Sequence, residues 1–142
     1  MSHPSIEPCG DPRPEARPLW GPPGYGRAGL NPRTVQRLCD LTALATAAAF
    51  AIPVGELVAR TRRPPYIAFA RQSAMYLAHV TFGLSYSEVG RAFGRDRTTA
   101  AYACRLIEER RDDPAVDGVL GSLESAFGAL RRRLSEPVRV RS

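Results

Sequence analysis

Apolar residues recur every three or four positions along most of the chain after residue 31, which is the spacing of one face of an α-helix. Segments with this spacing cover 32–50, 54–59, 67–82, 85–94, 97–111 and 114–133. The last segment carries an apolar stripe formed by Val116, Val119, Leu120, Leu123, Phe127 and Leu130. No stretch of any length alternates between apolar and polar residues as a half-buried strand would. The pattern predicts an all-α fold.

Residues that cap helix N-termini stand immediately before four of these segments, and they are Asn31, Ser85, Asp96 and Asp113. Glu88 follows Ser85 at the spacing of a capping box. Gly83 is placed to end the helix over 67–82, because glycine readily adopts the left-handed conformation found after helix C-termini. The segment 60–65 contains a Pro pair and is predicted to be an irregular basic loop, with the next helix starting at about Ile67.

Composition divides the chain into one helical domain and two tails. Residues 1–32 hold eight Pro and five Gly and few residues that could join a core, and such a composition cannot offset the entropy lost on ordering. We therefore expect a disordered Pro/Gly-rich tail over 1–30, a helical domain over 31–134 and a C-terminal tail over 135–142. Trp20 and Tyr25 are aromatic side chains through which the N-terminal tail could dock onto a protein partner.

Positive charge is concentrated in the middle of the sequence. The 142 residues include 20 Arg, no Lys and 14 acidic residues, which gives a net charge of +6 at pH 7. Eight Arg and only two acidic residues lie between positions 60 and 105, so the remainder of the chain is neutral overall. A basic segment of this kind is typical of proteins that bind a polyanion.

The residue inventory excludes several classes of protein. A chain without Lys has no Walker-type phosphate loop and no Schiff base. The two His and three Cys lack the spacing of a zinc site, and no catalytic set of side chains converges, so we expect no metal, no cofactor and no enzyme. The longest apolar run, over 41–52, has twelve residues, whereas roughly 20 are needed to span a bilayer. Because the N-terminus also lacks the features of a signal peptide, we expect a cytoplasmic protein with no membrane partner.

Residues 85–111 have the layout of a helix-turn-helix: a short capped helix, a turn containing Gly94, and a longer helix that opens with polar residues. The face of the second helix predicted to pack inward carries Ala100, Ala103, Cys104 and Ile107. The face predicted to meet a DNA groove and its phosphates carries Thr98, Ala101, Tyr102 and Arg105. Together with the local charge, this layout favours double-stranded DNA as the partner over an ordinary helical hairpin.

The run from Arg71 to Glu109, RQSAMYLAHVTFGLSYSEVGRAFGRDRTTAAYACRLIEE, resembles domain IV of the bacterial chromosomal replication initiator DnaA. It carries the family's RQxAMYLA segment, and SYSEVGRAFG and GRDRTTAAYACRLI are similar to its short helix and its signature. The similarity extends over about residues 33–134 and implies a Trp-repressor-like helical domain that binds DNA. Because a chain without Lys cannot supply the initiator's phosphate loop, we expect a stand-alone protein that lacks the ATPase domain and binds no nucleotide.

The resemblance implies DNA contacts from three parts of the domain. In the basic loop, Arg63 matches an Arg that enters the minor groove, and Arg62 matches a phosphate contact. The contacts implied for the helix over 67–82 are Arg71, Gln72 and His79, the last standing where the family usually has a Lys. The contacts implied for the start of the recognition helix are Arg97, Thr98 and Thr99, and the position of Tyr102 and Arg105 on its outer face adds these two.

Two functions fit this interpretation, and one rival remains. The chain could bind initiator-type boxes and regulate replication initiation at the nucleoid, or it could be a transcriptional regulator that uses the same domain. The rival is a protein-interaction adaptor that docks through residues 1–30 and the acidic run over 108–113, with vestigial DNA binding. The turn over 94–97 has one Gly fewer than the family and Arg97 in place of a His, so the preferred base sequence is expected to differ.

Overall fold

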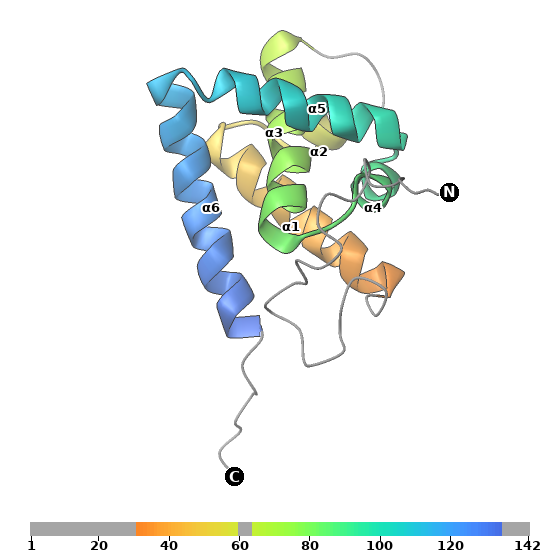
Figure 1. Ribbon diagram of the computed structural model, residues 1–142. Helices are drawn as coiled ribbons and strands as arrows, with labels where there is room; N and C mark the ends of the chain where they lie inside the picture. The colour runs from red at the N-terminus through yellow and green to blue at the C-terminus, as the bar shows by residue number, and fades with distance from the viewer. Residues whose placement is uncertain (1–30, 60–63, 135–142) are drawn as a thin grey trace, which may run out of the picture.

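A computed structural model describes residues 31–59 and 64–134, and every regular element within these two stretches is a helix (Figure 1). The helices are α1 (Pro32–Ala49), α2 (Val54–Val58), α3 (Pro65–Phe82), α4 (Tyr86–Ala92), α5 (Arg97–Arg110) and α6 (Pro114–Leu134). The predicted all-α fold is therefore confirmed. The tails predicted at 1–30 and 135–142, and residues 60–63 of the basic loop, lie outside the described residues. No helix in the described stretches is long and apolar enough to cross a membrane.

The predicted caps fix the helix ends. The Asn31 side-chain oxygen accepts a hydrogen bond from the Thr34 N–H at 2.9 Å, and α1 begins at the following Pro32. Ser85 and Glu88 form both bonds of the capping box at the start of α4, since each side chain accepts from the other residue's N–H at 3.1 and 2.9 Å. Gly83 has a φ of +69°, the left-handed conformation expected after α3.

The start of α3 differs from the sequence prediction. The helix begins at Pro65 rather than near Ile67, so the basic loop is shorter than the predicted 60–65. The Pro64 carbonyl accepts hydrogen bonds at 3.0 Å from the N–H groups of Ile67 and Ala68. A proline is well tolerated at the first helical position because the N–H that it lacks would have no partner inside the helix. The Pro pair therefore starts a helix here rather than preventing one.

Helix α3 forms the centre of the molecule, crossed by α5 and flanked by α6 (Figure 1). It contacts each of the other five helices. Ala70, Ala74 and Ala78 follow one another at intervals of four residues, and all three are fully buried. Because alanine is small, a row of alanines on one helix face lets the neighbouring helices approach closely. Leu77 and Phe82 are also fully buried and fill the space at this centre.

Helix α6 packs against the core through its predicted apolar stripe except Val119, since Val116, Leu123 and Leu130 are partly buried there. Leu120 and Phe127 are buried, and the Phe127 ring packs against Phe82 with 5.7 Å between ring centroids. Val119, predicted to face inward, is instead 40% exposed. Arg131 donates a hydrogen bond to the Thr81 carbonyl at 3.0 Å and so satisfies a group in the last turn of α3. The helix therefore packs on the core through one apolar stripe and leaves its other faces in solvent.

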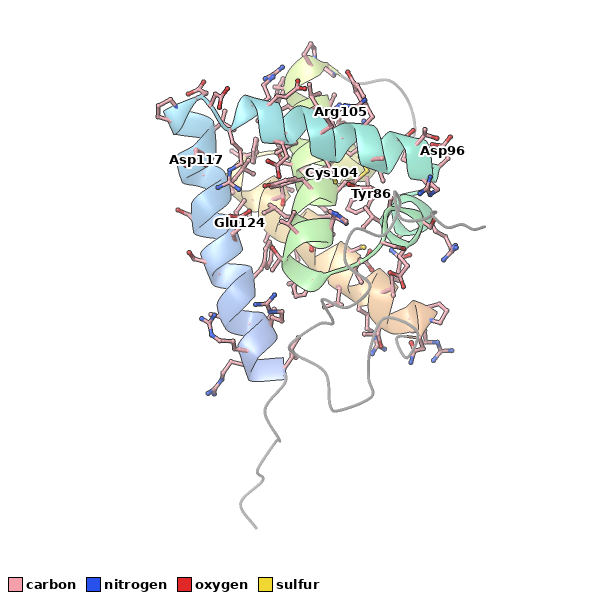
Figure 2. All side chains as sticks on the ribbon, viewed as in Figure 1. Tyr86, Asp96, Cys104, Arg105, Asp117 and Glu124 are labelled. Atoms are coloured by element: carbon pink, nitrogen blue, oxygen red, sulfur yellow. The ribbon has the colours of Figure 1, made fainter. Side chains whose placement is uncertain are left out.

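The turn between α5 and α6 is held by the guanidinium of Arg111. It donates to Asp117 and Glu124 of α6 at 2.6 Å each, and to the Tyr76 hydroxyl of α3 at 3.1 Å. Figure 2 shows both carboxylates on α6. Burial alone lowers the pKa of Arg111, but the bonds to Glu124, Asp117 and Tyr76 outweigh it and hold the pKa above its ordinary value. This charged cluster joins three helices through one side chain.

Candidate nucleic-acid interface

Asp96 fixes the start of α5. This start is the end of α5 that adjoins α4 (Figure 2). Its carboxylate accepts a hydrogen bond from the Thr99 N–H at 2.9 Å. This bond, with others from the Thr99 and Thr98 hydroxyls, lowers the pKa of Asp96 below its ordinary value. The carboxylate is therefore charged at neutral pH and engaged by the helix, which confirms that Asp96 is a cap.

The two faces of α5 separate as the sequence predicted. The buried face consists of Ala100, Ala103, Cys104 and Ile107, each no more than 4% exposed. On the other face Thr98, Tyr102 and Arg105 are exposed, and the Arg105 guanidinium lies 5.9 Å from the centroid of the Tyr102 ring. This outer face presents hydroxyl, aromatic and guanidinium groups to solvent. Such groups suit the floor of a DNA groove and its phosphates.

A tight turn sets the angle between α4 and α5. Gly94 has a φ of +69°, and the Arg95 N–H donates to the Gly90 carbonyl at 2.7 Å. A Cβ atom placed on Gly90 would lie 2.8 Å from the Asp96 carbonyl oxygen. This distance is too short for a stable contact, so only glycine allows the backbone of the turn to lie directly on α4. The outer face of α5 is thereby held in one orientation relative to α4.

The structure places Arg71 and Gln72 on the first turns of α3, where both are half-buried. The guanidinium of Arg71 donates to the carbonyls of Leu57 at 2.8 Å and Ala59 at 3.3 Å. Arg71 therefore binds the C-terminal end of α2, a role that the sequence did not reveal. Arg62 and Arg63, the predicted loop contacts, lie outside the described residues.

His79 does not occupy the exposed position that a phosphate contact needs. The residue is 5% exposed, and its Nδ1 lies 2.7 Å from the Leu84 carbonyl oxygen, so Nδ1–H is the donor. Its ring stacks on Tyr86 with 4.4 Å between centroids. The DNA-backbone contact of His79 stays a prediction, and in this structure the side chain joins the α3–α4 connection to the core. The interface proposed below omits it.

Arg95 is the residue near this surface that sequence reasoning missed. Its guanidinium donates to the Ala59 carbonyl at 3.0 Å, a contact between positions 36 residues apart. No local pattern could have revealed this bond, because it depends on how α2 packs against the turn. Arg71 and Arg95 thus join the end of α2 to α3 and to the turn that precedes α5.

The comparisons with known proteins agree with this geometry. Residues 41–107 match the family described as bacterial dnaA protein helix-turn-helix. The chain is similar to the chromosomal replication initiator protein DnaA of Lactococcus lactis subsp. cremoris, with 41% identity over 68 residues, and to that of Acinetobacter baumannii strain AYE, with 44% over 70 residues. These alignments cover 46% and 48% of this chain but only 15% of each relative.

The matched residues run from within α1 to near the end of α5 and so include all of the helix-turn-helix except the last residues of α5. The buried face of α5, the capped start at Asp96 and the turn through Gly94 all lie inside the match. Helix α6 lies beyond it. Residues 41–107 of the chain are thus similar to the bacterial DnaA helix-turn-helix family.

Proposed function

We propose that this protein binds double-stranded DNA sequence-specifically and acts on initiator-type boxes in the regulation of replication initiation. The observation that carries the proposal is the outer face of α5, where Thr98, Tyr102 and Arg105 are exposed on a helix whose opposite face is buried. The similarity to the DnaA helix-turn-helix family supports it, since the relatives are named chromosomal replication initiator proteins. The central block of positive charge also supports it, because phosphate neutralisation dominates affinity for DNA.

In the proposed complex, α5 lies in the major groove with its first residues nearest the base edges. Arg97, Thr98 and Thr99 then read bases, while Arg105 reaches a flanking phosphate. Arg62 and Arg63 are proposed to bind the adjacent phosphates and minor groove, as the family resemblance implies. Arg71 and Gln72 are proposed to contact the DNA backbone and base edges, as the family resemblance implies. The action proposed is binding alone, with no catalytic step.

Fluorescence anisotropy tests this proposal with two labelled duplexes, one carrying an initiator-type box and one with the same bases scrambled. Measured at two salt concentrations, the box should bind about 10³-fold more tightly than the scrambled duplex, with a steep salt dependence. Equal weak binding of both duplexes would contradict the proposed target and would call for selection from a random duplex library. Absence of salt-dependent binding would contradict DNA binding itself and favour a protein-interaction role.

Three variants separate base readout from phosphate contact. Thr99→Ala should cost about 1–3 kcal/mol on the box and little on scrambled DNA, provided that its melting temperature shows an intact fold. Arg62→Ala should weaken both duplexes similarly and reduce the salt slope by about one. Arg37→Ala removes one exposed charge from α1, outside the proposed surface, and should leave the salt slope unchanged. If Thr99→Ala and Arg62→Ala behaved alike, the groove assignment would be wrong.

A further inference from the structure

The C-terminal end of α2 depends on side chains from elsewhere in the chain. Helix α2 has five residues, and no side chain caps its N-terminus. Helices of this length are unstable alone, and their last carbonyls have no partner inside the helix. Leu57 anchors α2 by its fully buried side chain. The carbonyls of Leu57 and Ala59 must therefore find their donors on other elements.

Two guanidinium groups from different elements supply these donors. Arg71 reaches from α3 and donates Nε–H to Leu57 and a terminal N–H to Ala59, at 2.8 and 3.3 Å. Arg95 reaches from the turn between α4 and α5 and donates to the same Ala59 carbonyl at 3.0 Å. A single carbonyl oxygen is thus shared by α3 and by the turn of the helix-turn-helix. The planar guanidinium, with its several fixed N–H donors, suits this bridging geometry.

Ala59 and Arg95 each lie next to a segment that is proposed to contact DNA. Ala59 is the last residue before the basic segment 60–63, and Arg95 is the last residue before Asp96, the cap of α5. The backbone of Arg95 is itself held by its N–H bond to Gly90 at 2.7 Å. One hydrogen bond therefore joins Ala59, which precedes the basic segment, to Arg95, which precedes the cap of the recognition helix.

We propose that Arg95 is a positioning residue that holds the attachment point of the basic segment at a fixed distance from the start of α5, so that one duplex meets both. Arg71 holds the same attachment point from α3. The inference rests on the proposed function, since it concerns how two DNA-contacting parts act together. In this proposal Arg95 sets the spacing between the minor-groove and major-groove contacts and does not contact DNA itself.

Limited trypsin digestion without DNA tests the contact independently of function. Arg60 and Arg62 are trypsin sites, whereas the Arg63–Pro64 bond resists trypsin. In Arg95→Ala, cleavage after Arg60 and Arg62, followed by mass spectrometry, should be about three- to ten-fold faster than in the unaltered protein, as expected for loss of one hydrogen bond. Arg91→Ala is the matched control, because it removes an exposed arginine from the same turn region and should leave the rate unchanged. Equal rates in the two variants would overturn the proposal.

A double-mutant cycle on box DNA tests the coupling itself. Arg63→Ala and Arg95→Ala should each weaken binding about ten-fold, but Arg63→Ala should cost less than about three-fold in the Arg95→Ala background. In the Arg91→Ala background, Arg63→Ala should still weaken binding about ten-fold. Additive losses with Arg95→Ala would mean that Arg95 contacts DNA directly, and would overturn the positioning role. If the unaltered protein bound no duplex, the proposed function would fail, while the trypsin result would still decide whether Arg95 holds Ala59.

Discussion

Cysteine thiols illustrate how burial controls chemistry at single residues. Cys104 lies on the inner face of α5, and Cys39 lies in α1, with 4% and 1% of their surfaces exposed. Burial, reinforced by the nearby carboxylates, raises the pKa of each thiol to about 12. Because only the thiolate is an effective nucleophile, both residues should be inert at physiological pH. Cys104 is thus a small core residue of the recognition helix.

Alkylation checks this expectation. In a Cys9→Ser variant, iodoacetamide at pH 8 should leave Cys39 and Cys104 unmodified in the folded protein, because the protonated and buried thiols do not react. Both should react fully after unfolding in guanidinium chloride, which serves as the control. Peptide mass spectrometry reports the result, and rapid modification of native Cys104 would contradict the described packing of α5.

Residue roles could be predicted wherever they depend on nearby residues. Asp96 and Ser85 were predicted as caps because a cap needs only its own side chain and an N–H three positions away. His79, Arg71 and Arg95 could not be assigned in this way. Their partners are carbonyls whose availability depends on where helices end and how they pack. The resemblance to a family implies DNA contacts for Arg71 and His79, whereas their hydrogen bonds to Leu57 and Leu84 could not be predicted from it.

The α4–α5 turn is the element whose geometry leaves least room for change. Gly90 lies against the backbone of Arg95 and Asp96, where a Cβ atom would approach three backbone atoms within 2.9 Å. Backbone atoms cannot move aside as the end of a flexible side chain can. Gly118 on α6 provides a contrast, because it is exposed and a Cβ atom there would meet nothing within 4 Å.

These two glycines give opposite predictions for the same substitution. Gly90→Ala should destabilise the protein by about 1–3 kcal/mol through overpacking, and should also weaken DNA binding because α5 must shift. Gly118→Ala should stabilise it by about 0.5–1 kcal/mol, since alanine favours the helix. Urea denaturation followed by circular dichroism measures both. A neutral Gly90→Ala variant would show that the turn is looser than described.

At the scale of helices, the existence of all six could be predicted from periodicity, but two details could not. The Pro pair suggested a break, although Pro65 starts α3 because a first-turn residue needs no N–H partner. The stripe on α6 predicts six inward residues, and five of them pack on the core to different depths, whereas Val119 is exposed. Periodicity predicts which residues share a face. It does not predict how wide a strip of that face the neighbouring helices cover.

For the molecule as a whole, Arg111 is the residue that ties α6 to the domain. Its side chain is 20% exposed and joins Asp117, Glu124 and Tyr76. Arg111→Met should preserve most of the side-chain volume but lower the free energy of unfolding by about 1–3 kcal/mol, because hydrogen bonds to charged groups are lost. Thermal unfolding measures the effect. Arg37→Met, at an exposed position on α1, is the control and should change stability by less than about 0.5 kcal/mol.

The central position of α3 also bears on the order in which the protein folds. Since all five other helices contact α3, a folding nucleus without it could form little of the core. Ala74→Gly, which weakens α3 at a fully buried position, should therefore slow refolding. Phe127→Ala on α6 should mainly accelerate unfolding, because the apolar stripe of α6 packs after the rate-limiting step. Stopped-flow circular dichroism can separate the two rates, and the reverse assignment would place the nucleus in α6.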